Sequence, residues 1–295
     1  MNPKQSTMIR AMTTDGAVRV LYAETTAIVN EAHKIHNTSK TMTAVLGRAL
    51  TGTSLIGSLL KDKDSSVTFQ LKGDGPAGTV ICVSDYAGNV RGCAGDPTVE
   101  LPPNSKGKLD VGRAVGKGTL HVMKDLGFGE PYIGLAPIIS GEIAEDLTSY
   151  FASSEQTPTV CALGVRTNSN NSCKAAGGYI IQLMPGADDE IITKLEESVR
   201  KLPAVTNLVT ECASNEEVIA RLLEGFEYDI FDELDISYKC NCSRERYSAA
   251  LISLGKDDLT DMYNDGQPVE TVCHFCGAKY VFSHEEVGEL LKEAK

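Results

Sequence analysis

Four of the nine cysteines fall in two close pairs near the end of the chain. The first pair is the motif Cys240-Asn241-Cys242, and the second is Cys273-His274-Phe275-Cys276. Structural Zn²⁺ is held by four soft ligands arranged as a tetrahedron, and two cysteine pairs brought together supply such a set. The spacing therefore predicts one Zn²⁺ per chain in the reduced state, with these metal ligands: Cys240, Cys242, Cys273 and Cys276.

The same spacing also allows oxidation within each pair. In an extended chain the Cα atoms of residues i and i+2 lie roughly 6.5 Å apart, which is near the upper limit for a disulfide, and a modest bend brings them into range. A CxxC turn is already in range. Oxidation would therefore most simply form the redox-active disulfides Cys240–Cys242 and Cys273–Cys276. His274, which lies between two of the ligands, is the alternative metal donor.

Loss of the metal has a predictable effect on stability. Zn²⁺ binding to small cysteine sites contributes about 10–16 kcal/mol of apparent folding free energy, while a whole domain is stable by only ~5–15 kcal/mol. The segment from Asp235 to Lys295 is short and can build only a small hydrophobic core. Peroxide attacks the thiolate form of cysteine, which is also the form that binds zinc. Oxidation of these sulfurs would therefore release the metal, and we expect the segment to unfold without it.

The elements that must position these cysteines follow from hydrophobic periodicity. A 3.6-residue period predicts helices, and alternation or short apolar runs bounded by turns predict strands. Three strands joined by tight turns, at residues 66–73, 78–85 and 90–94, predict an antiparallel meander. The remaining predictions are helices at 27–36, 41–60 and 142–151, and strands at 18–23, 119–123, 132–139, 160–165 and 179–184.

The net charge differs sharply between the first two-thirds and the last third of the chain. Residues 1–187 carry 17 Lys and Arg against 16 Asp and Glu, whereas residues 188–295 carry 11 against 24. Amphipathic helices are predicted in the acidic part, including one capped by Ser214-Asn-Glu-Glu217. The fold class is therefore α+β, with an N-terminal domain of mostly antiparallel β-sheets flanked by helices, a helical linker and a small C-terminal zinc-binding domain. We place these parts at residues 1–184, 185–234 and 235–295.

Composition excludes several classes of protein. The odd number of cysteines and the length of 295 residues argue against a small secreted protein held together by disulfides. No apolar run is long enough for a membrane span, and the first residues lack the apolar segment of a secretory signal, so we expect a cytoplasmic protein. The net charge of −12 argues against nucleic acid as a partner. The other five cysteines are expected to be plain thiols: Cys82, Cys93, Cys161, Cys173 and Cys212.

The C-x-C and C-x-x-C pairs resemble those of the 33 kDa chaperonin family of redox-regulated heat-shock chaperones. Three further segments, Pro131–Pro137, Ser140–Asp146 and Ser154–Gln156, are similar to the core-domain sequence of that family. The resemblance covers essentially the whole chain. It implies an ATP-independent holdase rather than an enzyme. The resemblance further implies that oxidation forms the two disulfides, releases zinc and unfolds the zinc-binding domain and the linker. This unfolding would promote a homodimer and expose apolar surface to unfolding client proteins.

Two other functions compete with this interpretation. A zinc-ribbon protein that binds nucleic acid would share the ligand spacing, but it would carry a basic stripe that is absent here. A thiol-disulfide oxidoreductase would use the Cys-His-Phe-Cys motif, but that motif normally opens a helix after a strand. Here the sequence after Cys276 predicts a short hairpin, followed by a helix that Ser283 caps.

Overall fold

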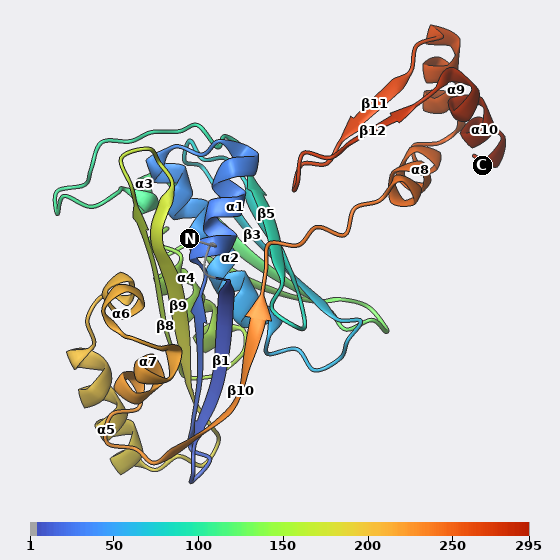
Figure 1. The fold of residues 1–295 in the computed structure, drawn as a ribbon. Helices are drawn as coiled ribbons and strands as arrows, with labels where there is room; N and C mark the ends of the chain where they lie inside the picture. Colours follow the sequence, from blue (N-terminus) through green and yellow to red (C-terminus); the bar gives the residue numbers. More distant parts are fainter. Residues whose placement is uncertain (1–4, 295) are drawn as a thin grey trace. The chain divides into compact units, whose positions relative to one another are not determined.

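The computed structural model describes residues 5–294, which form two compact units divided between Lys239 and Cys240. Figure 1 shows the helices and strands of both units. Within the described residues, no helix combines the length and the apolar character needed to cross a membrane. The mixed α+β class and the antiparallel pairing that the sequence predicts are confirmed.

The first unit contains two five-stranded antiparallel sheets. The strand order of one sheet is β10-β1-β2-β9-β8, and that of the other is β5-β4-β3-β6-β7. The predicted meander is confirmed as β3, β4 and β5, since β4 pairs with both of the others. The strands have these bounds: β1 Ser6–Thr13, β2 Val18–Glu24, β3 Ser66–Gly73, β4 Val80–Asp85, β5 Val90–Ala94, β6 Gly118–Asp125, β7 Tyr132–Pro137, β8 Thr159–Thr167, β9 Cys173–Leu183 and β10 Tyr228–Ile236.

Helix α2 (Lys40–Gly57) forms the centre of the main core, because it packs against strands of both sheets. It begins at Ser39, whose hydroxyl accepts a hydrogen bond from the Met42 amide. Nearly every residue of α2 is buried, so its sequence is apolar or small all round rather than amphipathic. Helices α1 (Thr26–His36), α3 (Val111–Val115) and α4 (Ala144–Ser153) complete the layer around it.

Three helices follow the sheets: α5 (Asp189–Lys201), α6 (Val205–Glu211) and α7 (Asn215–Leu222). Figure 1 shows them on one side of the sheet that contains β8 and β9. Their buried apolar residues form a second core with the outer face of that sheet, separate from the core around α2. Side chains on both sides of this contact are fully or almost fully buried: Ile9, Val18, Val20, Tyr22 and Ile181 from the sheet, and Leu208, Val218, Ile219 and Leu222 from the helices.

The end of the predicted helical linker is corrected by the structure. Residues 228–236 form strand β10, which pairs antiparallel with β1, with one register shift between Arg10 and Ala11. The Arg10 guanidinium of β1 pairs with the Asp232 carboxylate across this ladder. The alternation of acidic and apolar side chains suits a strand at a sheet edge, and the free edge of β1 supplied the hydrogen bonds. The compact unit ends at Lys239, so residues 185–234 pack within the first unit.

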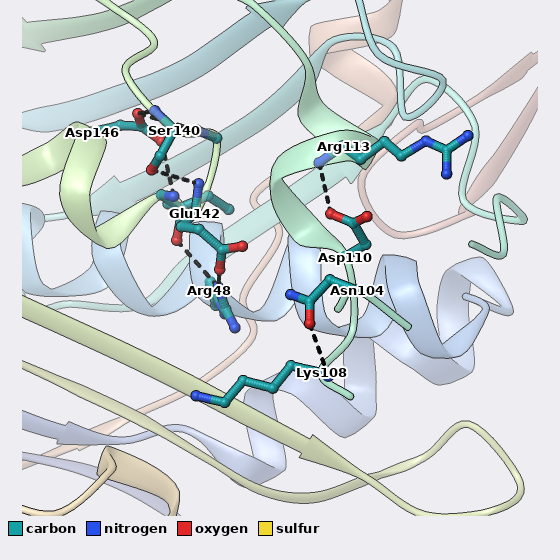
Figure 2. Close-up of polar contacts among 10 residues, drawn as sticks. Arg48, Asn104, Lys108, Asp110, Arg113, Ser140, Glu142 and Asp146 are labelled. Carbon is teal, nitrogen blue, oxygen red and sulfur yellow. Dashed lines mark hydrogen bonds and ion pairs between the residues drawn. The ribbon is translucent and has the colours of Figure 1, made fainter. Parts of the chain in front are cut away.

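A buried carboxylate organises the loop that joins β7 to α4. Asp146 is fully buried, and its Oδ1 atom accepts hydrogen bonds from the amides of Ile139 and Ser140 at 2.7 and 3.0 Å. Its Oδ2 atom accepts one from the Ile143 amide at 2.9 Å. Figure 2 shows this loop beside the ion pair between Arg48 of α2 and Glu142. The loop is thus fixed to the central helix by polar contacts.

Replacing Asp146 is therefore expected to destabilise the first unit. In Asp146→Asn the amide nitrogen would face at least one backbone N–H that now donates to a carboxylate oxygen. Hydrogen bonds to charged groups are worth about 1.5–3 kcal/mol, so we expect the free energy of unfolding to fall by about 2 kcal/mol. Urea unfolding of the reduced chain measures this change. The matched control is Glu145→Gln, an exposed neighbour, and an equal loss in both variants would contradict the assignment.

The second unit is built from three helices and one hairpin. The hairpin strands are β11 (Val269–Val272) and β12 (Lys279–Phe282), and they pair antiparallel in register. Among the described residues of this unit, the apolar core consists of four buried side chains, namely Leu251, Leu259, Phe282 and Val287. The helices are α8 (Arg244–Ser253), α9 (Lys256–Asp265) and α10 (His284–Glu293).

Candidate metal centre

The turn of the C-terminal hairpin holds the second cysteine pair. The Cys273 amide donates to the Ala278 carbonyl at 2.8 Å, and the Gly277 amide donates back to the Cys273 carbonyl at 2.8 Å. Gly277 has φ of 71°, a left-handed conformation that favours glycine. This tight turn brings Cys273 and Cys276 to the same side of the hairpin. The predicted hairpin is thus confirmed.

The predicted cap on the final helix is also confirmed. The Ser283 hydroxyl accepts from the Glu286 amide, and the Glu286 carboxylate accepts from the Ser283 amide. Glu286 also pairs with Arg244 at 2.6 Å. Arg244 is the first residue of α8, directly after the Cys242-Ser243 dipeptide. The helix that follows the first cysteine pair is therefore tied to the helix that follows the second.

The four paired cysteines meet in one cluster, which we call the cysteine cluster: Cys240, Cys242, Cys273 and Cys276. All four Sγ atoms lie within 4.8 Å of one another. The Sγ atoms of Cys240 and Cys273 are 3.7 Å apart, and those of Cys242 and Cys276 are 3.4 Å apart. Zn–S bonds of ~2.3 Å in a tetrahedron require sulfur separations of roughly 3.8 Å. The cluster therefore fits a tetrahedral metal ion.

The short sulfur contacts join one pair to the other, and none of the four cysteines is in a disulfide. That arrangement is the one expected of a reduced metal site, in which both pairs face a common centre. His274, the alternative donor, is exposed and does not belong to the cluster.

Two tyrosines donate hydrogen bonds to the cluster. The Tyr280 hydroxyl lies 3.2 Å from the Cys242 Sγ atom. The Tyr247 hydroxyl hydrogen-bonds to the Cys273 sulfur. Sequence reasoning missed both residues. The only available signal was that each tyrosine follows a cysteine pair closely in the sequence, which does not distinguish a ligand contact from an ordinary surface position.

The electrostatics of the cluster favour a thiolate at Cys273. Burial opposes ionisation of this thiol, but the backbone amides of Cys276 and Phe275 and the Tyr247 hydroxyl donate to its sulfur and lower its pKa to about 7. Burial and hydrogen bonds with neighbouring sulfurs instead raise the pKa of Cys276 to about 12. Four crowded sulfurs cannot all ionise without a cation among them. A divalent metal would supply that charge and hold all four as thiolates.

The five scattered cysteines stand apart from this cluster. Cys82 is fully buried in β4, and burial raises its pKa well above the usual value. Burial likewise raises the pKa of Cys161 and Cys173 to about 12. Such thiols are poor nucleophiles at neutral pH. The environments of these three cysteines agree with the prediction of plain thiols.

The setting of the Cys-His-Phe-Cys motif bears on the oxidoreductase alternative. The motif joins two hairpin strands, β11 and β12. A thioredoxin-like site instead places its CxxC motif at the start of a helix, where the helix dipole lowers the pKa of the first thiol. The structure therefore lacks the helical setting on which that alternative depends.

Comparison with known proteins places the whole chain in one family. The sequence model of the family described as Hsp33 protein matches residues 6–283. The 33 kDa chaperonin of Ruminiclostridium cellulolyticum is 45% identical over 286 residues, covering 97% of this chain and 98% of the relative. That of Clostridioides difficile is 46% identical over 287 residues, with the same coverage of both chains.

A solved structure agrees with these relatives. The crystal structure of the 33 kDa chaperonin from Thermotoga maritima superposes with a TM-score of 0.89 at 37% identity, covering 98% of each chain. The sequence resemblance, the paired cysteines and the fold thus lead to the same result: this chain belongs to the Hsp33 family of 33 kDa chaperonins.

Proposed function

We propose that this chain is a redox-regulated holdase of the cytoplasm that binds unfolding client proteins without ATP and catalyses no reaction. In the proposed cycle, the reduced chain binds one Zn²⁺ and is inactive. The observation that supports this function is the gathering of four sulfurs within 4.8 Å in a unit with a core of only four buried residues. A metal contributes more to such a unit than its apolar core can.

The proposed switch is the formation of two disulfides, Cys240–Cys242 and Cys273–Cys276. For each disulfide, two thiolates and two protons react with one molecule of hydrogen peroxide, which gives one S–S bond and two molecules of water. The sulfurs lose two electrons and the peroxide oxygens gain them. Zn²⁺ then has no thiolate donors and leaves, and the second unit loses its main source of stability.

The segment just before Cys240 connects the switch to the linker. The Val90 amide donates to the Ser237 carbonyl at 2.9 Å, and the Lys239 amide donates to the Val90 carbonyl at 3.0 Å. The Tyr238 hydroxyl donates to the Gly92 carbonyl at 2.9 Å. This segment thus continues β10 along the edge of the other sheet. In the proposal, disorder that begins at Cys240 spreads through these contacts to β10 and the helices before it.

The proposed client surface is the outer sheet face that α5, α6 and α7 cover. The contact between these helices and the sheet is apolar on both sides. Release of the predicted linker, residues 185–234, would expose it, and contiguous exposed apolar surface is the usual mark of a protein-binding site. The same surface would allow two oxidised chains to form the proposed homodimer. No nucleic acid or membrane is part of this proposal.

The experiment that tests the proposed function combines peroxide with mild heat. We expect the reduced parent chain to release one zinc per chain and then to suppress aggregation of a thermally unfolding client. Chelator absorbance measures the zinc, and light scattering measures the aggregation. Variants Cys240→Ser and Cys273→Ser should lose this peroxide response. The proposal is wrong if both variants respond to peroxide as the parent does.

A further inference from the structure

The two tyrosines beside the cysteine cluster are arranged crosswise. Tyr247 lies on α8, which follows the first cysteine pair, yet its hydroxyl hydrogen-bonds to Cys273 of the second pair. Tyr280 lies on β12, which follows the second pair, yet its hydroxyl donates to Cys242 of the first pair at 3.2 Å. Each tyrosine therefore links its own segment to a sulfur of the opposite segment.

The rings of the two tyrosines hold each other in place. Their centroids are 4.9 Å apart with an angle of 31° between the ring planes. Both side chains are half-buried and pack against the small core of Leu251, Leu259, Phe282 and Val287. The positions of the two hydroxyls are therefore set by packing rather than by a flexible surface side chain.

We infer that Tyr247 and Tyr280 are positioning residues that brace the two cysteine pairs against each other and slow their oxidation. The identity of the metal in this inference rests on the proposed function. A hydroxyl that donates to a thiolate withdraws charge from the sulfur and makes it less nucleophilic toward peroxide. Hydrogen-bond partners of metal ligands also orient the ligand and strengthen metal binding.

The hydrogen bonds of the two tyrosines are also weaker in the oxidised product. A Cys240–Cys242 bond forms only when peroxide takes two electrons from these two thiolates, and a disulfide sulfur is a weaker acceptor than a thiolate. The Tyr280 hydroxyl then loses its charged acceptor at Cys242. The Tyr247 hydroxyl loses its acceptor at Cys273 in the same way when the second disulfide forms. Oxidation of either pair thus removes one of the two cross-links.

The first test compares zinc release from the reduced full-length chain at a fixed peroxide concentration. We expect Tyr247→Phe and Tyr280→Phe each to release zinc several-fold faster than the parent, and the double variant to be faster than either. Zinc affinity should fall about tenfold for each lost hydroxyl. The matched control is Tyr263→Phe in the same unit, whose ring stacks on His284 and which should behave as the parent.

The second test uses Co²⁺ in place of zinc, because the sulfur-to-cobalt charge-transfer band reports on the thiolates directly. Loss of a hydroxyl donor should shift this band to lower energy in Tyr247→Phe and Tyr280→Phe, but not in Tyr263→Phe. A purely structural role would leave the band in place. Unchanged band energy and unchanged zinc release in the double variant would overturn the inference. If instead the parent fails to respond to peroxide, the proposed function fails, and the cobalt spectra still decide the role of the tyrosines.

Discussion

Removal of zinc from the reduced chain is expected to unfold residues 240–294 while the core of the first unit around α2 stays folded. Zn²⁺ contributes about 10–16 kcal/mol to small thiolate sites, and the second unit has only four buried apolar residues to replace it. The first unit has two apolar cores and does not contain the cluster. Hydrogen exchange and far-UV circular dichroism of the full chain, before and after chelation under reducing conditions, measure this difference.

A cysteine variant should reproduce the effect of the chelator. Cys273→Ser removes one ligand of the cluster and is expected to expose the amides of α8, α9 and α10 to exchange even with zinc in the buffer. Cys212→Ser is the matched control, because Cys212 lies outside the cluster and should leave exchange unchanged. A metal-free second unit that keeps its amide protection would show that the metal is dispensable for this fold.

Truncation of a buried side chain in the linker is expected to switch on client binding without any oxidant. Leu222 of α7 is fully buried against the outer sheet face. Leu222→Ala leaves a cavity at this contact and should weaken it by about 2–5 kcal/mol. The helices α5 to α7 would then open more often, and the reduced zinc-bound variant should suppress client aggregation in light-scattering assays.

The control for this variant conserves volume. Leu222→Met keeps an apolar side chain of similar size and should remain inactive until peroxide is added. Hydrogen exchange at α7 reports whether the helix has opened in each variant. If α7 exchanges freely in Leu222→Ala and the reduced chain still fails to suppress aggregation, then the covered face is not the client surface.

The sequence predicted much of this protein because several of its signals are local. Alternating apolar residues predicted β3 at residues 66–73, and the sequence after Cys276 predicted the hairpin. Each pattern reflects hydrogen bonds and burial within a short segment. The two cysteine pairs identified the candidate metal ligands from the sequence alone, since four thiolates in two close pairs have few other uses.

Strands β1 and β10 were not predicted. β1 forms a local hairpin with β2 that the sequence analysis missed, whereas β10 depends on a partner that lies far away in the sequence. Their pairing joins Ser6 to Ile236 and Thr13 to Tyr228, and no local pattern encodes it. The acidic residues of β10 instead suggested part of a helical linker. A strand at a sheet edge tolerates such residues, because one of its faces meets water.

The sequence alone determined which four sulfurs could bind a metal. It also determined which segments place apolar residues at the period of a strand or of a helix. The tertiary structure alone decided that those sulfurs lie within 4.8 Å of one another, and that Tyr247 and Tyr280 reach across to opposite pairs. The reason is that ligand type is a property of a single residue. The distance between two residues depends instead on every turn and packing contact of the chain between them.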